Sequence, residues 1–192
     1  MKKKIVFLIF MIGVVVCLSG CGKETQKIYN IEIKVKDMGS IKVELDAEEA
    51  PITVKNFVKL VQDEFYDGLT FHRVVENFMI QGGDPEGNGF GGLDKKIKGE
   101  FKENGVENNI SHRRGTISMA RSKDPDSASC QFFIVHKDSI FLDGKYAAFG
   151  HVTEGMEIVD EIAENTPVED EESGYVNKDN QPVIESIRLI EE

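Results

Sequence analysis

Apolar and polar residues alternate along the first patterned segment of the chain, residues 28–36, and again through residues 41–45. This period of two is typical of a half-buried β-strand, which turns successive side chains to opposite faces. Turn residues 37–40 separate the two segments, so together they predict a β-hairpin. Further strand-like segments follow at residues 69–75, 78–81, 116–120, 131–135, 147–152 and 183–190.

Two segments instead carry apolar residues at helical spacing. Pro51 begins the first, because proline favours the first turn of a helix. Its core-facing stripe consists of Val54, Phe57, Val58 and Val61. The second segment follows Gly155, and its stripe consists of Met156, Val159, Ile162 and Ala163. Many short antiparallel strands with two separated helices predict a mostly β fold, a closed β-barrel with helices at its ends.

Three polar segments connect these elements. Residues 82–92 hold six glycines and predict a loop with unusual backbone angles. A phosphate-binding loop is the alternative, but no Gly-Lys-Ser/Thr follows the glycines and no helix start is evident. Residues 95–114 are polar and irregular, and predict a long loop. Residues 168–181 are acidic and turn-rich, and predict a solvated surface loop.

The N-terminal residues have the pattern of a targeting segment. Basic residues 2–4 precede an apolar stretch at 5–16, which is too short to span a membrane comfortably. Leu18-Ser19-Gly20-Cys21 then resembles the lipobox of bacterial lipoproteins. This resemblance implies a signal peptide at residues 1–20, a lipid on Cys21, a short tether at 21–27, and a location on the extracytoplasmic face of the cell membrane. An uncleaved anchor and an ordinary signal peptide with a chance cysteine are the alternatives.

The net charge bears on the binding partners of the protein, and the number of cysteines bears on its disulfides. The chain has 23 basic and 34 acidic residues, a net charge of −11, which argues against nucleic acid binding. If residues 1–20 are removed and Cys21 carries lipid, Cys130 is left alone and no internal disulfide can form. A lone cysteine is usually a small buried hydrophobe, and a redox role is the alternative.

Two long blocks carry a family resemblance. Residues Phe71–Gly92 read FHRVVENFMIQGGDPEGNGFGG, and residues Ser118–Gly150 read SMARSKDPDSASCQFFIVHKDSIFLDGKYAAFG. Together they resemble the cyclophilin family of peptidyl-prolyl cis-trans isomerases. The resemblance implies one domain at residues 28–192, an eight-stranded antiparallel barrel capped by two α-helices, which acts as a monomer without a cofactor or metal. It implies as partners the proline-containing segments of unfolded or folding exported proteins.

Isomerisation of an X-Pro bond needs no nucleophile, because its barrier of about 18–20 kcal/mol comes from amide resonance. A catalyst must hold the proline ring in an apolar pocket and favour the twisted amide, in which the lone pair of the prolyl nitrogen is freed. A fixed, always-charged donor can do this. The resemblance assigns that role to Arg73, whereas a lone strand arginine would ordinarily be a surface residue.

The resemblance places further residues in the site. Gln81 is expected to orient the substrate backbone, with which Ala120 and Arg121 are expected to pair. His72 is expected to be structural, and for Met79 a place in the barrel core is a real rival. The proline-pocket positions are Phe78, Met79, Phe133 and Leu142, and the positions that line the site around them are Gln131, Phe141 and Tyr146.

Three positions depart from the family's usual pattern. Arg121 stands where an asparagine is common, Phe141 where many members have tryptophan, and Tyr146 where many have histidine. Phe141 keeps the apolar area but lacks the indole N–H donor, which by the resemblance helps to bind the inhibitor cyclosporin. The sequence therefore predicts catalytic competence with a weakened affinity for cyclosporin.

Two other classes of function fit parts of the sequence. A chaperone without catalysis would use the same pocket to hold proline segments, and the activity of Arg73→Ala would separate the two. A solute-binding lipoprotein fits less well, because the chain is short and shows no two-lobed organisation. The main prediction is a lipid-anchored isomerase that assists the folding of exported proteins, whose prolyl bonds can limit folding.

Overall fold

The structure, a computed structural model, describes residues 28–191 of the chain. Its α-helices are α1 (Pro51–Gln62) and α2 (Met156–Asn165), and short 3-10 helices occupy Lys102–Asn104, Ile140–Leu142 and Lys178–Asn180. Its strands are β1 (Ile28–Val35), β2 (Gly39–Asp46), β3 (Phe71–Val75), β4 (Met79–Gly82), β5 (Thr116–Met119), β6 (Phe132–Val135), β7 (Ala148–Glu154) and β8 (Ile184–Ile190). The strands and helices predicted from the pattern are confirmed, with ends that shift by one or two residues.

The alternating N-terminal segments form the predicted hairpin. β1 and β2 pair antiparallel, with Ile31 opposite Val43 and Ile33 opposite Ile41. These four side chains are buried, while the intervening residues face the other side of the ladder. The period of two therefore decides which face of the hairpin enters the core.

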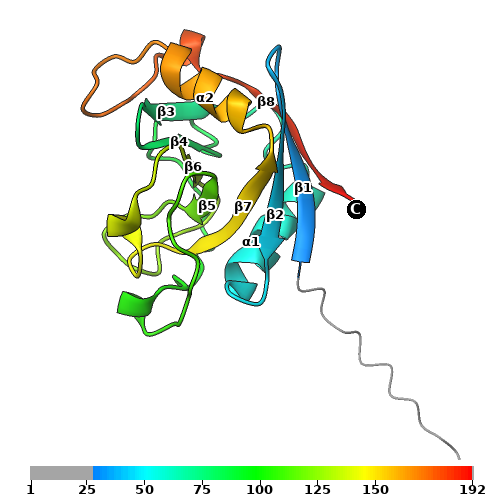
Figure 1. Ribbon diagram of the computed structural model, residues 1–192, viewed down its shortest axis with the longest axis vertical. Helices are drawn as coiled ribbons and strands as arrows, with labels where there is room; N and C mark the ends of the chain where they lie inside the picture. The colour runs from blue at the N-terminus through cyan, green and yellow to red at the C-terminus, as the bar shows by residue number, and fades with distance from the viewer. Residues whose placement is uncertain (1–27, 192) are drawn as a thin grey trace, which may run out of the picture.

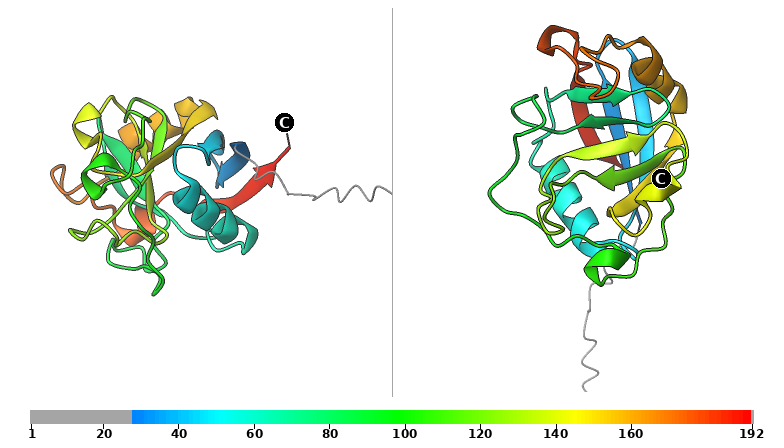
Figure 2. Two further views of the ribbon diagram at one scale, coloured as in Figure 1. Left: turned by 90° about the horizontal axis from the view of Figure 1, so that it is seen from below. Right: turned by 90° about the vertical axis from the view of Figure 1, so that its left-hand side faces the viewer.

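All ladders join into one antiparallel sheet with the strand order β3-β4-β6-β5-β7-β2-β1-β8. The sheet curls on itself, and α2 covers one end of the curl while α1 covers the other (Figures 1 and 2). Helix α1 contacts β8 and β2, and helix α2 contacts β2, β3 and β4.

The structure does not show the expected closed barrel, because β3 and β8 do not form a ladder. The chain ahead of these strands meets in an isolated bridge between Thr70 and Val183, beside a hydrogen bond of 2.7 Å from Ile184 N–H to the carbonyl of Leu69. Further along β3, its outer edge bonds to residues 174–176 instead, so that edge is not available to β8. The fold is mostly β, a curled half-barrel of eight antiparallel strands with two helices.

Helix α1 receives its N-terminal cap from a distant loop. Ala50 at its N-cap position offers no side-chain hydrogen bond. Instead the buried carboxylate of Glu100 accepts from the backbone N–H of Ile52 (3.0 Å) and of Thr53 (2.7 Å), and from the Thr53 hydroxyl (2.7 Å). A carboxylate is well placed here, since it satisfies free N–H groups at the positive end of the helix dipole. The loop at residues 95–114, expected to be polar and irregular, thus contributes to the core.

Aromatic rings fill the centre of the curl. Phe57 of α1 lies 5.0 Å from Tyr66 and 5.4 Å from Phe132, measured between ring centroids. The Tyr66 hydroxyl donates to the carbonyl of Cys130 at 2.9 Å, so this buried polar group is satisfied. Cys130 itself is fully buried, and burial raises the pKa of its thiol. That environment agrees with a small apolar packing role for Cys130.

The acidic segment at residues 168–181 departs from expectation. It was predicted to be a solvated loop, but Gly174, Val176 and Gln181 are buried and residues 174–176 bond to β3. As the run of acidic residues predicts, positions 169–172 are exposed. The segment is therefore exposed at its tip and bound to the sheet at its base.

None of the helices within residues 28–191 is long and apolar enough to cross a membrane. The predicted signal peptide at 1–20 and the tether with Cys21 at 21–27 lie outside the described residues. They remain predictions from the sequence.

Candidate functional site

An open cavity of about 310 Å³ lies on the outer face of the sheet. It collects residues from β3, β4 and β6, from the segment after β5, and from the Ile140–Leu142 turn with the residues that follow. Its lining consists of Arg73, Phe78, Met79, Gln81, Ala120, Arg121, Phe133, Phe141, Leu142 and Tyr146. The structure thus brings together every expected catalytic and substrate-binding residue except Gln131, which lines the cavity next to it.

Sheet register places the central residues of the cavity in one row. Arg73 of β3 pairs with Gln81 of β4, which pairs with Phe133 of β6. Phe133 pairs on its other side with Ser118 of β5. Because successive strand residues face opposite sides, this row lies away from the main core. The alternate residues Ile80, Ile117 and Ile134 belong to the main core.

A β-bulge at His72 turns Arg73 toward the cavity. Phe71 pairs with Gly82 while Arg73 pairs with Gln81, so β3 carries one residue more than β4 between these pairs. In a regular strand Phe71 and Arg73 would share a face. With the bulge, Phe71 packs in the main core and Arg73 lines the cavity, a use of bulges that is common near active sites.

The apolar side of the cavity has its own small cluster. Met79 and Phe133 are almost fully buried, and they pack with Val135 and Leu142 apart from the main core. Met79 is thus both a buried residue and part of the cavity wall, so the two readings of its position do not compete. This wall offers aromatic and flexible apolar surface to a ring-shaped group.

Two hydrogen bonds orient the guanidinium of Arg73. Its Nε donates to the carbonyl of Ser173 at 2.7 Å, and its Nη1 donates to Oε1 of Gln81 at 3.3 Å. The remaining N–H groups have no hydrogen-bond partner among residues 28–191. Burial lowers the pKa of Arg73 from its ordinary value, and the group still stays charged at neutral pH. The guanidinium of Arg73 is therefore a positively charged group in a fixed position, with unpaired N–H donors beside an apolar wall.

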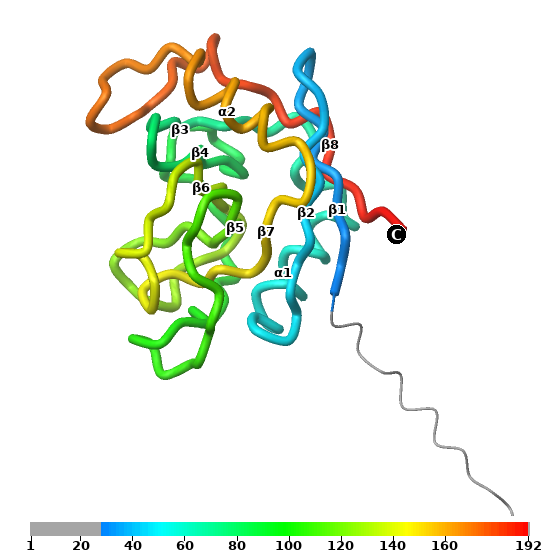
Figure 3. Tube along the Cα trace, in the orientation of Figure 1, coloured from blue at the N-terminus to red at the C-terminus, as the bar shows by residue number. Residues whose placement is uncertain are grey.

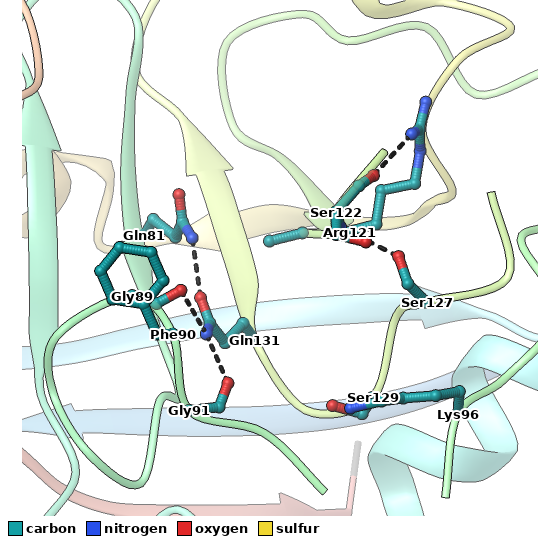
Figure 4. A pocket seen from close by; sticks show the side chains of 11 residues that line it. Gln81, Gly89, Phe90, Gly91, Lys96, Arg121, Ser122, Ser127, Ser129 and Gln131 are labelled. Carbon is teal, nitrogen blue, oxygen red and sulfur yellow. Dashed lines mark hydrogen bonds between the residues drawn. The ribbon is translucent and has the colours of Figure 1, made fainter. Parts of the chain in front are cut away.

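Two glutamines continue this arrangement into the glycine-rich loop. Nε2 of Gln81 donates to Oε1 of Gln131 at 2.8 Å (Figure 4). Nε2 of Gln131 then donates to the carbonyls of Gly91 at 2.8 Å and Gly89 at 3.3 Å. In this series of hydrogen bonds every donor points away from Arg73, which gives each glutamine amide a single orientation. Gln131 supports Gln81 rather than lining the same cavity.

A second cavity of about 400 Å³ adjoins the first, since Gln81, Ala120 and Arg121 line both. Its floor is the glycine-rich loop, which folds around the buried carboxylate of Asp84. That carboxylate accepts from the backbone N–H of Glu86, Asn88, Gly89 and Gly91. Burial alone would raise the pKa of Asp84, but these bonds together outweigh it and hold the pKa below its ordinary value.

Arg121 has a structural task that sequence reasoning missed. Its guanidinium lies 4.6 Å from the ring centroid of Tyr146 and 5.0 Å from that of Phe101. Its Nε and Nη2 donate to the carbonyl of Lys145 at 3.0 and 2.7 Å. The Arg121 side chain thus fixes the segment that carries Tyr146, and little of it remains free for a ligand.

A Ser-His-Asp arrangement stands behind the cavity, with Ser118 and His112 buried and Asp143 partly exposed. Nδ1 of His112 lies 2.9 Å from Oδ1 of Asp143, and its Nε2 lies 3.0 Å from the hydroxyl of Ser118. The His112 ring stacks on Phe133 at 6.0 Å between centroids. Ser118 is fully buried, so it is not accessible to a substrate as a nucleophile. No sequence motif signalled this cluster, and its place behind Phe133 makes it a support for the cavity wall.

His72 lies in the interior and does not reach the cavity. It is fully buried, and its two ring nitrogens have no hydrogen-bond partner in the described part of the chain. Burial lowers the pKa of His72, which favours the neutral ring. Within residues 28–191 no group of three or more His, Cys, Asp and Glu side chains could hold a metal ion.

Comparisons with known proteins identify the family of this chain. The family model described as cyclophilin type peptidyl-prolyl cis-trans isomerase/CLD matches residues 30–189. A peptidyl-prolyl cis-trans isomerase of Acinetobacter baylyi is 41% identical over 160 residues, which cover 80% of this chain and 82% of that protein. Peptidyl-prolyl cis-trans isomerase B of Bacillus subtilis is 46% identical over 123 residues, covering 64% of this chain and 82% of that protein.

Solved structures give the same answer. A cyclophilin type peptidyl-prolyl cis-trans isomerase of Cryptosporidium parvum, crystallised in the presence of the dipeptide Ala-Pro, is similar with a TM-score of 0.74 and 30% sequence identity. The match covers 85% of this chain and 99% of that one. With the family model spanning nearly all of the described residues, this chain belongs to the cyclophilin-type peptidyl-prolyl cis-trans isomerases.

Proposed function

We propose that Arg73 is the catalytic donor of this isomerase, and that the cavity beside it holds the proline ring of the substrate. The observation that carries this proposal is the position of the Arg73 guanidinium. Ser173 and Gln81 hold it by hydrogen bonds, and its other N–H groups are free beside the apolar wall that contains Met79 and Phe133. A donor fixed at that place stabilises the twisted amide more than the planar one. Differential stabilisation of this kind lowers the barrier.

The other cavity residues have matching roles in the proposal. Phe78, Met79, Phe133 and Leu142 enclose the proline ring, and Phe141 and Tyr146 form the open side. The side-chain amide of Gln81 accepts from Arg73 and donates one N–H to Gln131. Its second N–H is left for the substrate backbone, so Gln81 contacts the substrate while it holds Arg73. The backbone N–H of Ala120 is bonded to Gln131, which leaves its carbonyl for the peptide.

The substrates that we propose are proline-containing segments of exported proteins. Support comes from the sequence before residue 28, where a basic segment, an apolar stretch and the Leu18-Ser19-Gly20-Cys21 box follow in the order of a lipoprotein signal. A diacylglyceryl group on Cys21 supplies two lipid chains, enough for stable anchoring. The isomerase then works at the extracytoplasmic face of the cell membrane, where exported chains arrive unfolded.

Two variants test the catalytic proposal. Purified protein is assayed with a short X-Pro peptide whose cis and trans forms a protease distinguishes, beside Arg73→Ala. We expect kcat/KM to fall by about a hundredfold or more in Arg73→Ala, because removal of one fixed donor typically costs that much. Circular dichroism is expected to stay unchanged. An Arg73→Ala protein with near wild-type activity would refute the role of Arg73.

Localisation is tested separately. Cells that express the full chain are grown with labelled palmitate and fractionated, beside cells that express Cys21→Ser. We expect label and membrane association in the wild type and neither in Cys21→Ser. An unlabelled wild-type protein, or one that stays inside the cytoplasm, would contradict the proposed anchor without affecting the proposal for Arg73.

Exposed aromatic rings on both cavity rims favour a second, holding function. Phe90 beside the second cavity is 85% exposed, and Phe141 beside the first is 61% exposed. Such rings can hold apolar segments of an unfolded chain. If holding is independent of catalysis, Arg73→Ala still suppresses aggregation of an unfolded client, whereas a Phe90→Ser, Phe141→Ser double variant does so less.

A further inference from the structure

The edge strand β3 is paired along its outer side by a segment that sequence patterns place on the surface. Residues 168–176, named here the strap, follow α2 and run beside β3 (Figure 3). Val74 N–H donates to the carbonyl of Gly174 at 2.7 Å, and Val176 N–H donates to that of His72 at 3.0 Å. Between these bonds Arg73 and Tyr175 form an antiparallel bridge. The strap therefore binds β3 at the residue that supplies the catalytic donor.

The tip of the strap is a turn organised by one carboxylate. Asp170 accepts from the backbone N–H of Glu172 at 3.0 Å and of Ser173 at 2.8 Å, and from the Ser173 hydroxyl. Gly174 N–H returns to the carbonyl of Asp170 at 3.0 Å. Gly174 has a φ of +68°, and a Cβ there would collide with the carbonyl of Val74. The turn thus has one defined conformation against β3.

This turn aims the Ser173 carbonyl at Arg73. The bond from Arg73 Nε to that carbonyl is 2.7 Å, shorter than the 3.3 Å bond from Nη1 to Gln81. A guanidinium is planar and rigid, so an acceptor on Nε and another on Nη1 fix the direction of all its remaining N–H groups. Without the Ser173 carbonyl, Gln81 alone would leave the group free to turn about one bond.

We propose that Asp170 is a positioning residue for the isomerase reaction, which acts through the Ser173 carbonyl on the orientation of Arg73. The inference rests on the catalytic role proposed above for Arg73. Asp170 does not line the cavity. Its influence on the rate passes through the turn.

A rival explanation is the negative charge of the strap, since residues 169–172 are all acidic. Glu172 separates the two. Its carboxylate carries the same charge two residues away, but only its backbone N–H takes part in the turn. Glu172→Ala therefore removes the charge and leaves the turn, while Asp170→Ala removes both. Asp170→Asn keeps the acceptor oxygen without the charge.

The experiment measures kcat and KM of the full-length protein in detergent with an X-Pro peptide. We expect Asp170→Ala to lower kcat about fivefold with KM changed less than twofold, because a misaligned donor affects the transition state rather than binding. Asp170→Asn is expected to recover most of the loss, and Glu172→Ala to behave as the wild type. Ser173→Ala removes the hydroxyl that donates to Asp170 and accepts from the Tyr175 N–H at 3.3 Å, and it is expected to give a smaller loss of the same kind.

The double variant decides whether Asp170 acts through Arg73. In an Arg73→Ala background, Asp170→Ala is expected to lower kcat no further, whereas a general loss of structure would add to the first effect. An NMR measurement gives an independent readout: exchange of the Arg73 Nε–H with water is expected to quicken in Asp170→Ala and not in Glu172→Ala.

Each outcome bears on one proposal. If Arg73→Ala keeps its activity, the role of Arg73 fails first. If Arg73→Ala is inactive but Asp170→Ala and Ser173→Ala keep wild-type kcat, or Glu172→Ala shares the loss, the role of Asp170 is overturned. Should Asp170→Ala fail to fold, Ser173→Ala with its thermal unfolding curve carries the same test.

Discussion

Asp84 and Gly91 are in such close contact that a Cβ built on Gly91 would overlap Oδ1 of Asp84. The N–H of Gly91 donates to the other oxygen of the same carboxylate at 3.3 Å, and its carbonyl accepts from Gln131 at 2.8 Å. One glycine thus joins the anchor of the loop to the amide chain that ends at Arg73. Its lack of a side chain is a requirement of packing.

Gly91→Ala is therefore expected to lower both stability and activity. The added methyl forces the loop away from Asp84, at a cost of about 1–3 kcal/mol in the free energy of unfolding. Loss of the carbonyl that holds Gln131 is expected to lower kcat/KM about tenfold through Gln81. Urea unfolding and the coupled isomerase assay measure the two effects.

Gly92→Ala is the matched control for that variant. A Cβ at Gly92 would meet the hydroxyl of Ser129 at 3.1 Å and Nζ of Lys96 at 3.3 Å, whereas a Cβ at Gly91 would lie only 1.9 Å from Oδ1 of Asp84. Its effects should be small. Equal losses in the two variants would mean that the loop tolerates no change at all, and the specific role of the Asp84 contact would be wrong.

Two buried histidines predict how stability depends on pH. Burial lowers the pKa of His72, and burial, against the opposing effect of Asp143, lowers that of His112. Each therefore binds more protons in the unfolded chain than in the folded one. Stability is expected to be full above the ordinary histidine pKa of about 6.5 and to fall as the pH drops below it, by up to about 1.4 kcal/mol per pH unit for each histidine.

Urea unfolding between pH 8 and pH 5 measures this slope. Most carboxylates titrate below that range. His72→Leu, which places an apolar side chain where two ring nitrogens lack partners, is expected to reduce the slope. A His72→Leu protein with the wild-type slope would show that His72 is not a source of the pH dependence.

Sequence periodicity predicted the strands that carry most of the cavity wall. Met79 and Phe133 alternate with Ile80 and Ile134 along β4 and β6, and this period of two separates wall from core. The family blocks then named the lining residues. What local pattern could not supply is the bulge at His72, since an extra residue is defined only by the partner strand.

The contacts between distant segments could likewise not be predicted from local sequence patterns. The strap carries the composition of a solvated loop, and only its pairing with β3 brings Ser173 to Arg73. The same pairing occupies the edge that a closed barrel would have joined to β8. Glu100 gave no sign of capping a helix, because the cap positions of α1 lie nearly fifty residues earlier in the chain. Turn and cap preferences act locally, and these contacts depend on tertiary structure.

Glu100 provides a stability prediction independent of the active site. In Glu100→Ala, the N–H groups of Ile52 and Thr53 lose their acceptor, and a buried polar group without a partner costs about 1–3 kcal/mol. The midpoint of urea unfolding is expected to fall accordingly, while kcat/KM of the folded protein stays unchanged because α1 does not line the cavity. Glu107→Ala, an exposed carboxylate in the same loop, is the control and should shift the midpoint little. A Glu100→Ala protein as stable as the wild type would mean that water replaces the cap without cost.

Phe141 leads to a prediction about inhibition. The ring is 61% exposed and tilts against Phe78 at 5.6 Å between centroids, so it supplies apolar surface but no hydrogen-bond donor at the cavity rim. If the indole N–H that many family members carry there helps to hold cyclosporin, the wild-type protein binds this inhibitor weakly. Phe141→Trp restores the donor and is expected to tighten inhibition about fivefold to tenfold, the worth of one hydrogen bond of about 1 kcal/mol or slightly more.

The measurement is the inhibition constant of cyclosporin in the isomerase assay, for the wild type, Phe141→Trp and Tyr146→His. Turnover of the X-Pro peptide should change little in Phe141→Trp, because the apolar area at the rim is kept. Tyr146→His tests the other departure, and since Tyr146 packs edge-on against Phe133 at 5.9 Å and lies under Arg121, its replacement is expected to affect peptide turnover as well as inhibition. Sub-micromolar inhibition of the wild type would refute the weakened affinity. If the inhibition constant of Phe141→Trp equals that of the wild type, the weakened affinity for cyclosporin would instead be due to Tyr146 and Arg121.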